Sequence, residues 1–155
     1  MLPPIYWESV RWALSAVIPT DHPTHPGGCL CGSVRFAVKG QLRPVVACHC
    51  RECRKQSGHF SAMTGVPLEH FTLLSGKALT WYRASTSVQR GFCATCGSKL
   101  FWQPDEAGWI AVAAGAFDGP LGVTLAQHIY CAEQGDYYDI ADGLPQEAGW
   151  NKKPG

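Results

Sequence analysis

The stretch Cys48-His49-Cys50-Arg51-Glu52-Cys53 places three thiols within six residues, and the rest of the chain is organised around it. Free cysteines usually pack as small, isolated apolar residues, so a cluster at this spacing indicates a chemical role. Two further pairs, Cys29-Leu30-Cys31 and Cys93-Ala94-Thr95-Cys96, bring seven of the eight cysteines into three short groups. The first question is therefore what these thiols bind.

Disulfide bonding and metal binding are the two interpretations of such clusters. A chain of 155 residues can bury a core as one domain and does not need cysteine cross-links to fold. The C-x-C and C-x-x-C spacings suit a metal ion or a redox switch, and thiols this close in sequence rarely meet disulfide geometry. We favour metal binding, and with it a reducing compartment.

Composition argues against two classes of partner. A net charge of +1 and a pI near 7.6 give none of the basic surface that nucleic-acid binding usually requires. The apolar residues 12–18 are too few to span a bilayer, and Glu8 and Arg11 interrupt the region where a signal peptide would be apolar. We expect a cytoplasmic protein without nucleic-acid or membrane partners, and the oligomeric state stays open.

The chain divides into three parts by composition. Residues 1–26 hold five of the eleven prolines and are interpreted as an N-terminal extension with one helical stretch, Glu8–Ala16. A single domain is expected over residues 27–148, beginning at Gly27-Gly28. Residues 149–155 are interpreted as a tail.

Short strand signals follow one another through this domain. In Ser33–Lys39 the apolar residues alternate with polar ones, which is the period of a half-buried strand. A short helix is expected at Glu52–Gln56, with Gly58 as its end. Further strands are expected at residues 44–47, 60–66, 71–74, 79–83, 88–92, 99–103, 109–114 and 125–131. Short strands separated by Gly, Pro and Ser turns predict a mainly β sandwich or barrel.

The cysteine groups differ in how completely they could surround zinc. Two short pairs, Cys29/Cys31 and Cys93/Cys96, offer the four thiolates of a closed structural site. The triplet of Cys48, Cys50 and Cys53 offers three ligands and no obvious fourth, which is how catalytic zinc is usually held. A soft, all-thiolate set favours a thiolate in the open position, and a thiol bound there would be deprotonated at neutral pH. The spacing therefore indicates a thiol substrate.

Three motifs resemble the glutathione-dependent formaldehyde-activating enzyme family, also called the centromere protein V/Gfa domain. They are Gly27-Gly28-Cys29-Leu30-Cys31-Gly32-Ser33-Val34-Arg35, Cys48 to Gly58, and Gly91-Phe92-Cys93-Ala94-Thr95-Cys96-Gly97. The later His128-Ile129-Tyr130 and Asp142-Gly143-Leu144-Pro145 also resemble stretches of that family, so the match runs in order to Pro145.

The resemblance implies a fold, two metal sites and a reaction. The fold is a mainly β, Mss4-like zinc-containing sandwich of short antiparallel strands with few short helices. Cys29, Cys31, Cys93 and Cys96 would hold a structural Zn²⁺, and Cys48, Cys50 and Cys53 would hold the ion where glutathione reacts. The implied reaction is a carbon–sulfur lyase type, in which glutathione and formaldehyde form or release S-hydroxymethylglutathione.

Several other side chains are candidates for the site, each with a plainer alternative. Arg51, Arg54 and Lys55 could receive the carboxylates of glutathione or form an ordinary solvated helix face. His59 and His128 are the histidines proposed for the site, whereas His49 is expected to point away as a hydrogen-bonded neighbour. Cys131 is expected to be a small buried residue of the last strand, or else a fourth zinc ligand. Four aromatic residues are expected to fill the core or to form the wall of a pocket: Trp81, Tyr82, Trp102 and Trp109.

Three functions fit these observations. The first is a zinc-dependent enzyme acting on glutathione, or a similar thiol, and a small aldehyde. The second is a zinc-stabilised module that binds a protein, and the third is a carrier that binds glutathione without accelerating the addition. The three-thiol group argues against a purely closed zinc site, so we favour the enzyme.

Overall fold

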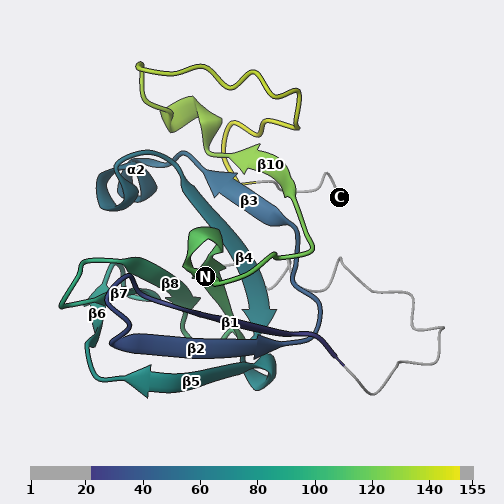
Figure 1. Cartoon of the computed structure of the whole chain (residues 1–155). Helices are drawn as coiled ribbons and strands as arrows, with labels where there is room; N and C mark the ends of the chain where they lie inside the picture. The colour runs from purple at the N-terminus through teal and green to yellow at the C-terminus, as the bar shows by residue number, and fades with distance from the viewer. Residues whose placement is uncertain (1–21, 151–155) are drawn as a thin grey trace.

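The computed structural model describes residues 22–150 and arranges ten strands in two sheets. Figure 1 shows the smaller sheet across the lower part of the molecule and the C-terminal residues above it. The predicted helical stretch Glu8–Ala16 lies outside the described residues. None of the helices between residues 22 and 150 is long and apolar enough to cross a membrane.

The smaller sheet has the strand order β1-β2-β5 and is antiparallel throughout. Its members are β1 (Thr24–Gly28), β2 (Val34–Lys39) and β5 (Phe71–Gly76). Alternation in β2 is as predicted, since every second side chain is buried. β1 was not predicted and begins three residues before Gly27, because its Thr-His-Pro-Gly-Gly sequence lacks the apolar alternation by which strands are recognised.

The larger sheet has the order β10-β3-β4-β9-β8-β7-β6. Its strands are β3 (Val45–Cys48), β4 (Ser61–Pro67), β6 (Leu79–Arg83), β7 (Val88–Cys93), β8 (Lys99–Pro104), β9 (Trp109–Ala113) and β10 (Leu125–Ile129). All neighbours pair antiparallel except β10 and β3, which are parallel. The mainly β prediction is confirmed, with one parallel pair at the edge that carries Cys48.

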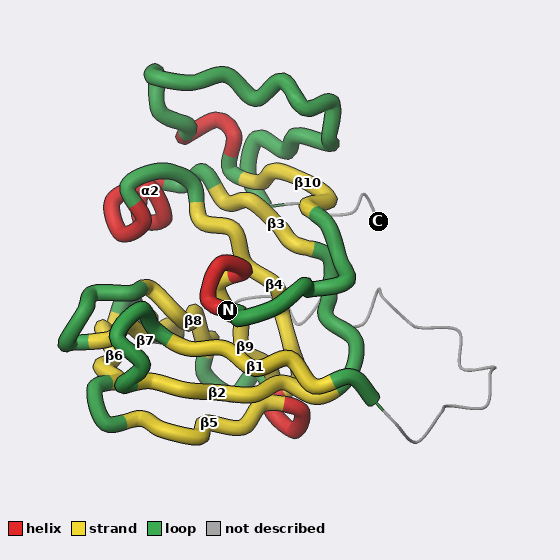
Figure 2. The backbone as a smooth tube through the Cα atoms, in the orientation of Figure 1, coloured by secondary structure: helices red, strands yellow, loops and turns green. Residues whose placement is uncertain are grey.

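Helices are few and short, as predicted (Figure 2). The α-helix α2 (Arg51–Ser57) joins β3 to β4 and ends at Gly58, which has the left-handed φ of 77° that favours glycine. The 3₁₀ turns are η1 (Leu68–His70), η2 (Ala114–Ala116) and η3 (Cys131–Glu133). α2 therefore begins close to the end of β3, and the cysteine triplet lies at this junction.

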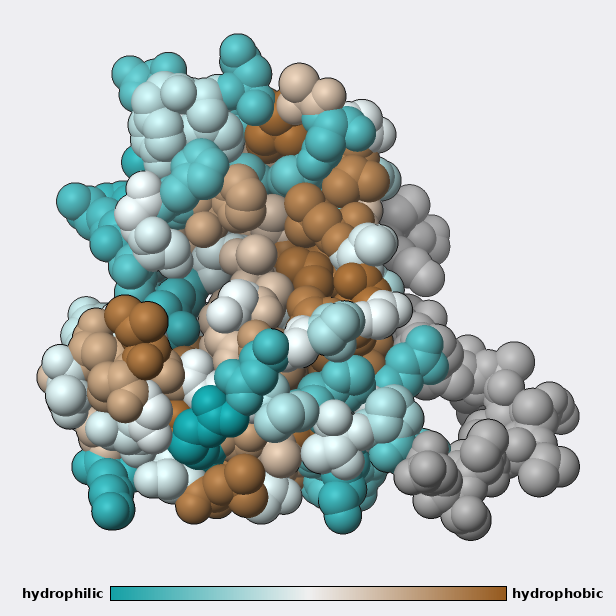
Figure 3. Space-filling model, viewed as in Figure 1, coloured by the Kyte–Doolittle hydropathy of each residue, from teal (hydrophilic) through white to brown (hydrophobic). Residues whose placement is uncertain are grey.

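The core lies between the two sheets and is built on aromatic side chains. Phe36 of β2 is fully buried and its ring centroid lies 5.7 Å from that of Phe71 and 5.5 Å from that of Phe101. Burial of side chains of this size contributes about 1.5–3 kcal/mol each to folding. Figure 3 shows a small apolar patch over β5, where Leu73 and Leu74 are partly exposed at the sheet edge.

The segment from Gln134 to Trp150 is irregular, as expected, but it is tied to β10 and η3. The amides of His128 and Cys131 donate to the carbonyls of Pro145 and Glu147, each at 2.9 Å. This segment therefore covers the edge strand β10. It also places the Tyr138 hydroxyl against Nδ1 of His49, which lies between Cys48 and Cys50 in the sequence.

Candidate functional site

The three thiols of the triplet, which we call the triad, converge at the junction of β3 and α2. Cys48 ends β3, Cys50 caps the helix, and Cys53 is buried in its first turn. Cys50 Sγ accepts a hydrogen bond from the Cys53 amide at 3.4 Å, and the three sulfur atoms lie within 4.8 Å of one another. Helix capping thus fixes the thiols on one side of the turn.

The other four thiols converge where the two sheets meet. Cys29 and Cys31 lie between β1 and β2, Cys93 is the last residue of β7, and Cys96 lies between β7 and β8. All four sulfur atoms lie within 4.8 Å of one another. The Leu30 amide also donates to Ser98 Oγ at 3.0 Å, so the two cysteine turns are joined by the chain itself. This group links the smaller sheet to the larger one.

Sulfur separations in the four-thiol group fit zinc. Four sulfurs at about 2.3 Å from a tetrahedral zinc lie about 3.8 Å apart. Cys31 Sγ lies 3.6 Å from Cys29 Sγ and 3.7 Å from Cys93 Sγ, and the cysteines are all free thiols. These four residues therefore have the number, chemistry and spacing of a closed zinc site. The triad has the same chemistry with one ligand fewer.

Two cations from the larger sheet reach the triad. Arg90 of β7 is buried and donates to Cys53 Sγ at 3.8 Å, to Gln56 Oε1 at 3.2 Å and to Glu52 Oε2 at 2.7 Å. Lys99 of β8 donates to Ser57 Oγ at 3.1 Å and to Ser61 Oγ. Hydrogen bonds from the Cys48 and Cys50 thiols, together with these two cations, lower the pKa of Cys53. This shift favours one thiolate, at Cys53, whereas hydrogen bonds with the neighbouring thiols, together with burial, raise the pKa of Cys48.

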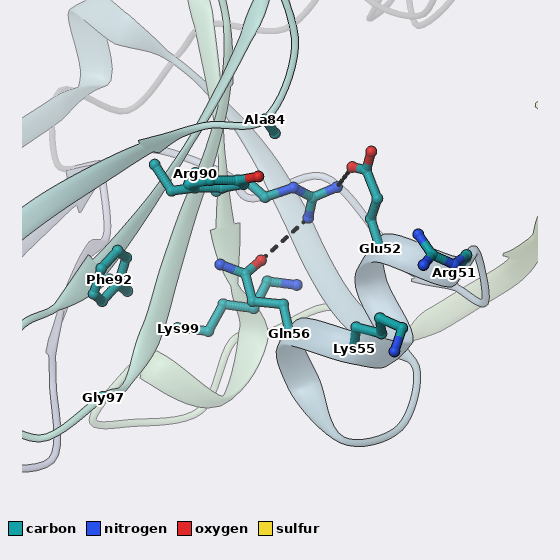
Figure 4. A pocket seen from close by; sticks show the side chains of 10 residues that line it. Arg51, Glu52, Lys55, Gln56, Ala84, Arg90, Phe92, Gly97 and Lys99 are labelled. Carbon is teal, nitrogen blue, oxygen red and sulfur yellow. Dashed lines mark hydrogen bonds and ion pairs between the residues drawn. The ribbon is translucent and has the colours of Figure 1, made fainter.

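An open groove of about 570 Å³ runs beside the triad, between α2 and β6–β8. Figure 4 shows Arg90 and Lys99 extending from the strands toward α2, where Gln56 and Glu52 face them. The groove is lined by Arg51, Glu52, Lys55, Gln56, Tyr82, Ala84, Arg90, Phe92, Gly97 and Lys99. Four of these side chains are cationic and one is anionic, so the groove favours an anionic ligand.

The predicted cationic residues of α2 separate into two sets. Arg51 and Lys55 are exposed and line the groove. Arg54 is partly buried and does not belong to the groove lining. Of the residues proposed to contact glutathione, Arg51 and Lys55 are therefore the two that the groove brings together.

The predicted histidines are not among the residues that line this groove. His49 is fully buried and hydrogen-bonds Tyr138 through Nδ1 and His128 through Nε2, so neither ring nitrogen is directed at the triad. His128 is also bound to Asp142 Oδ2 at 2.8 Å. His59 contacts the hydroxyl of Tyr137 at 3.3 Å. His49 is thus a hydrogen-bonded neighbour of the triad, as predicted. His128 and His59 form hydrogen bonds with other polar side chains and belong to neither thiol group.

Two further predictions differ from the structure. Cys131 lies in η3 rather than in the last strand, because β10 ends at Ile129 and Tyr130 adopts a left-handed φ of 55° that turns the chain. Cys131 also belongs to neither thiol group. Tyr82 lines the groove and is 60% exposed, so it forms a pocket wall and is not a core residue.

Residues of the site that the sequence did not indicate come from distant strands. Arg90 and Lys99 are separated from the triad by more than thirty residues. An arginine in a strand facing a buried thiol has no local signature. Only the strand order, which places β7 and β8 across from α2, brings them to the site.

The fold and the two thiol groups define a class of protein: a two-sheet β domain with one group of four convergent thiols and one group of three. The chain belongs to the glutathione-dependent formaldehyde-activating enzyme family, whose model matches residues 24–133. The matched residues include both thiol groups. The mainly β architecture agrees with the Mss4-like fold that the sequence resemblance implied.

Individual relatives support the same assignment over part of the chain. Proteins of Aspergillus flavus and Aspergillus oryzae, each named "Putative glutathione-dependent formaldehyde-activating enzyme", are 34% identical over 83 residues. The match covers 49% of this chain and 44% of each relative, so the chain spans less than half of their length. A crystal structure of a Rhodobacter sphaeroides protein matches with a TM-score of 0.54 and 25% identity, over 65% of this chain and 99% of that one.

Proposed function

We propose that this protein is a zinc-dependent enzyme of the carbon–sulfur lyase type, acting on glutathione or a similar thiol and on formaldehyde or another small aldehyde. It would form or cleave the S-hydroxymethyl adduct of the thiol. The observation that carries this proposal is the convergence of three thiols, with no fourth ligand among the residues described, beside a cationic groove. Family membership supplies the thiol and the aldehyde.

The residues that would hold metal follow from the two thiol groups. Cys29, Cys31, Cys93 and Cys96 would hold a structural Zn²⁺, and Cys48, Cys50 and Cys53 would hold a second, exchangeable Zn²⁺. A zinc ion held by the triad would lower the pKa of a bound thiol, so that its sulfur is a nucleophile at neutral pH.

The chain's own residues would bind and orient the thiol substrate. Arg51 and Lys55 occupy the outer part of the groove and are suited to the carboxylates of glutathione, with Arg51 able to form a bidentate contact. Arg90 fixes α2 against β7 and so holds Cys53 in place. Holding the thiol and the aldehyde in a well-oriented encounter would remove much of the entropic barrier to this addition.

A rate measurement separates this enzyme from a glutathione carrier. Zinc-loaded protein should accelerate S-hydroxymethylglutathione formation above the uncatalysed rate, and Cys50→Ser should return the rate to background. Cys131→Ser is the matched control, since Cys131 belongs to neither thiol group, and it should keep the wild-type rate. Glutathione binding without any acceleration would indicate a carrier instead.

A further inference from the structure

Lys99 lies close to the triad, and metal binding by the three thiols assigns no role to it. Its ammonium donates to Ser57 Oγ at 3.1 Å and to Ser61 Oγ. Ser61 is the register partner of Cys48 across β3 and β4, and Ser57 lies one helical turn beyond Cys53. The two hydroxyls therefore hold the ammonium between α2, which carries Cys53, and the first residue of β4, which pairs with Cys48.

The charge of Lys99 lies beside residues that adjoin the triad and is not neutralised by a carboxylate among residues 22–150. Arg90, the other cation, forms an ion pair with Glu52 at 2.7 Å. Lys99 forms no ion pair with any carboxylate between residues 22 and 150, and its hydrogen bond to Ser61 holds the ammonium beside the residue that pairs with Cys48 in the sheet. A cation in this position favours negative charge that develops near the triad.

Lys99 also keeps a donor available. An ammonium has three N–H donors, and within the described part of the chain the structure commits two of them, to Ser57 and Ser61. Lys99 lines the groove, and Figure 4 shows its side chain reaching toward α2 beside Gln56. A molecule that enters the groove and places its sulfur at the triad would therefore meet the third N–H.

We propose that Lys99 is a catalytic residue that stabilises the alkoxide oxygen formed from the aldehyde. This role rests on the function proposed above. The substrate sulfur forms a bond to the aldehyde carbon, and the π electron pair of the carbonyl moves to oxygen. Lys99 donates a hydrogen bond to that oxygen, and water in the open groove supplies its proton. The proton lost by the thiol on binding balances this uptake, so the thiol and the aldehyde give the hydroxymethyl thioether with no other reactant.

The variants Lys99→Met and Lys99→Arg test this role. Removal of one donor to a developing oxyanion typically costs about 10²–10³ in kcat. Lys99→Met should lower kcat by about 10²-fold while the KM for glutathione and the zinc content stay within about threefold of wild type. Lys99→Arg keeps charge and donors and should recover most of the loss. Lys77→Met, at an exposed lysine after β5, is the matched control and should leave kcat unchanged.

The outcomes separate this role from a structural one. An unchanged kcat in Lys99→Met, or a loss that comes with loss of zinc or of glutathione binding, would overturn the catalytic role of Lys99. Thermal unfolding of each variant identifies any that fails to fold. If Lys99→Met fails to fold, the kcat of Lys99→Arg at full zinc content decides whether Lys99 has the catalytic role. A wild-type rate equal to background would overturn the proposed function itself, whereas a fast wild type with an equally fast Lys99→Met overturns only this inference.

Discussion

His49 Nε2 and His128 Nδ1 lie 2.8 Å apart and share a hydrogen bond, although the two residues are separated by 79 positions in the chain. His49 sits between two thiols of the triad, and His128 lies in β10 and is bound to Asp142. Both rings are buried. This contact links the triad to the irregular segment that follows Gln134, so that segment helps to hold the site.

Replacement of His128 by leucine should destabilise the protein and loosen the triad. The substitution leaves His49 Nε2 buried without its partner, which costs about 1–3 kcal/mol of the free energy of unfolding. Urea unfolding measures the loss, and a competition assay should show weaker zinc binding at the triad. His70→Gln, at an exposed histidine, is the control and should unfold as wild type does. Equal stability of His128→Leu and wild type would contradict this account of the contact.

Arg90 and Arg83 provide a test of how burial changes the contribution of an ion pair to the free energy of unfolding. Arg90 is 6% exposed and holds α2 against β7, whereas Arg83 is 53% exposed and pairs with Asp105 at 2.7 Å. Arg90→Met removes hydrogen bonds to a thiol, an amide and a carboxylate, and should cost about 2 kcal/mol of stability. Arg83→Met should cost less than about 1 kcal/mol. Similar unfolding midpoints for the two variants would show that Arg90 does not anchor the helix.

The pair of Arg35 and Asp118 predicts an acid-sensitive contribution to stability. The hydrogen bond from Arg35 lowers the pKa of Asp118 below its ordinary value. The contribution is therefore fully present above the unfolded-state pKa of about 3.9 and is lost as the pH falls through the lower folded-state pKa. Asp118→Asn should unfold more easily than wild type at about pH 7 and equally easily at about pH 2. High salt should reduce the difference, because both groups are partly exposed; a difference that grows on acidification would refute this assignment.

The sequence predicted the triad because the spacing of its three thiols is local, and it predicted each pair of the four-thiol group for the same reason, although Cys31 and Cys93 are 62 residues apart and meet only in the fold. Cys48, Cys50 and Cys53 are thiols separated by one strand end and one helical turn, and capping at Cys50 is a property of those residues alone. β2 was predicted for the same reason, since its alternation is contained in six residues. Local chemistry was sufficient for these features.

The groove and its cations could not be predicted from such local patterns. Lys99 follows the Cys93/Cys96 turn in sequence, yet its ammonium lies at Ser57 and Ser61 because β8 runs back past α2. β1 and the parallel β10–β3 pair depend equally on tertiary contacts, since Thr24–Gly28 has little strand propensity of its own. Contacts between distant strands decide these parts of the site.

Zinc release should occur in two steps. A site with three thiolates has one protein bond fewer than a site with four, so a competing chelator should remove zinc from Cys48, Cys50 and Cys53 first. A chromogenic chelator follows both steps by absorbance, and Cys50→Ser should lose the fast step alone. Cys131→Ser should keep both steps. Release in one step from wild type, or a fast step that persists in Cys50→Ser, would be incompatible with two unequal sites.

The most direct test of the open position at the triad is a glutathione titration of the cobalt-substituted protein. Cobalt reports its ligands through its visible and thiolate charge-transfer absorption, so a fourth thiolate changes the spectrum. We predict that glutathione increases this absorption to one equivalent in wild type and in Cys131→Ser, with no change in Cys50→Ser. A spectrum that already shows four fixed protein ligands at both sites and does not respond to glutathione would contradict the proposed chemistry.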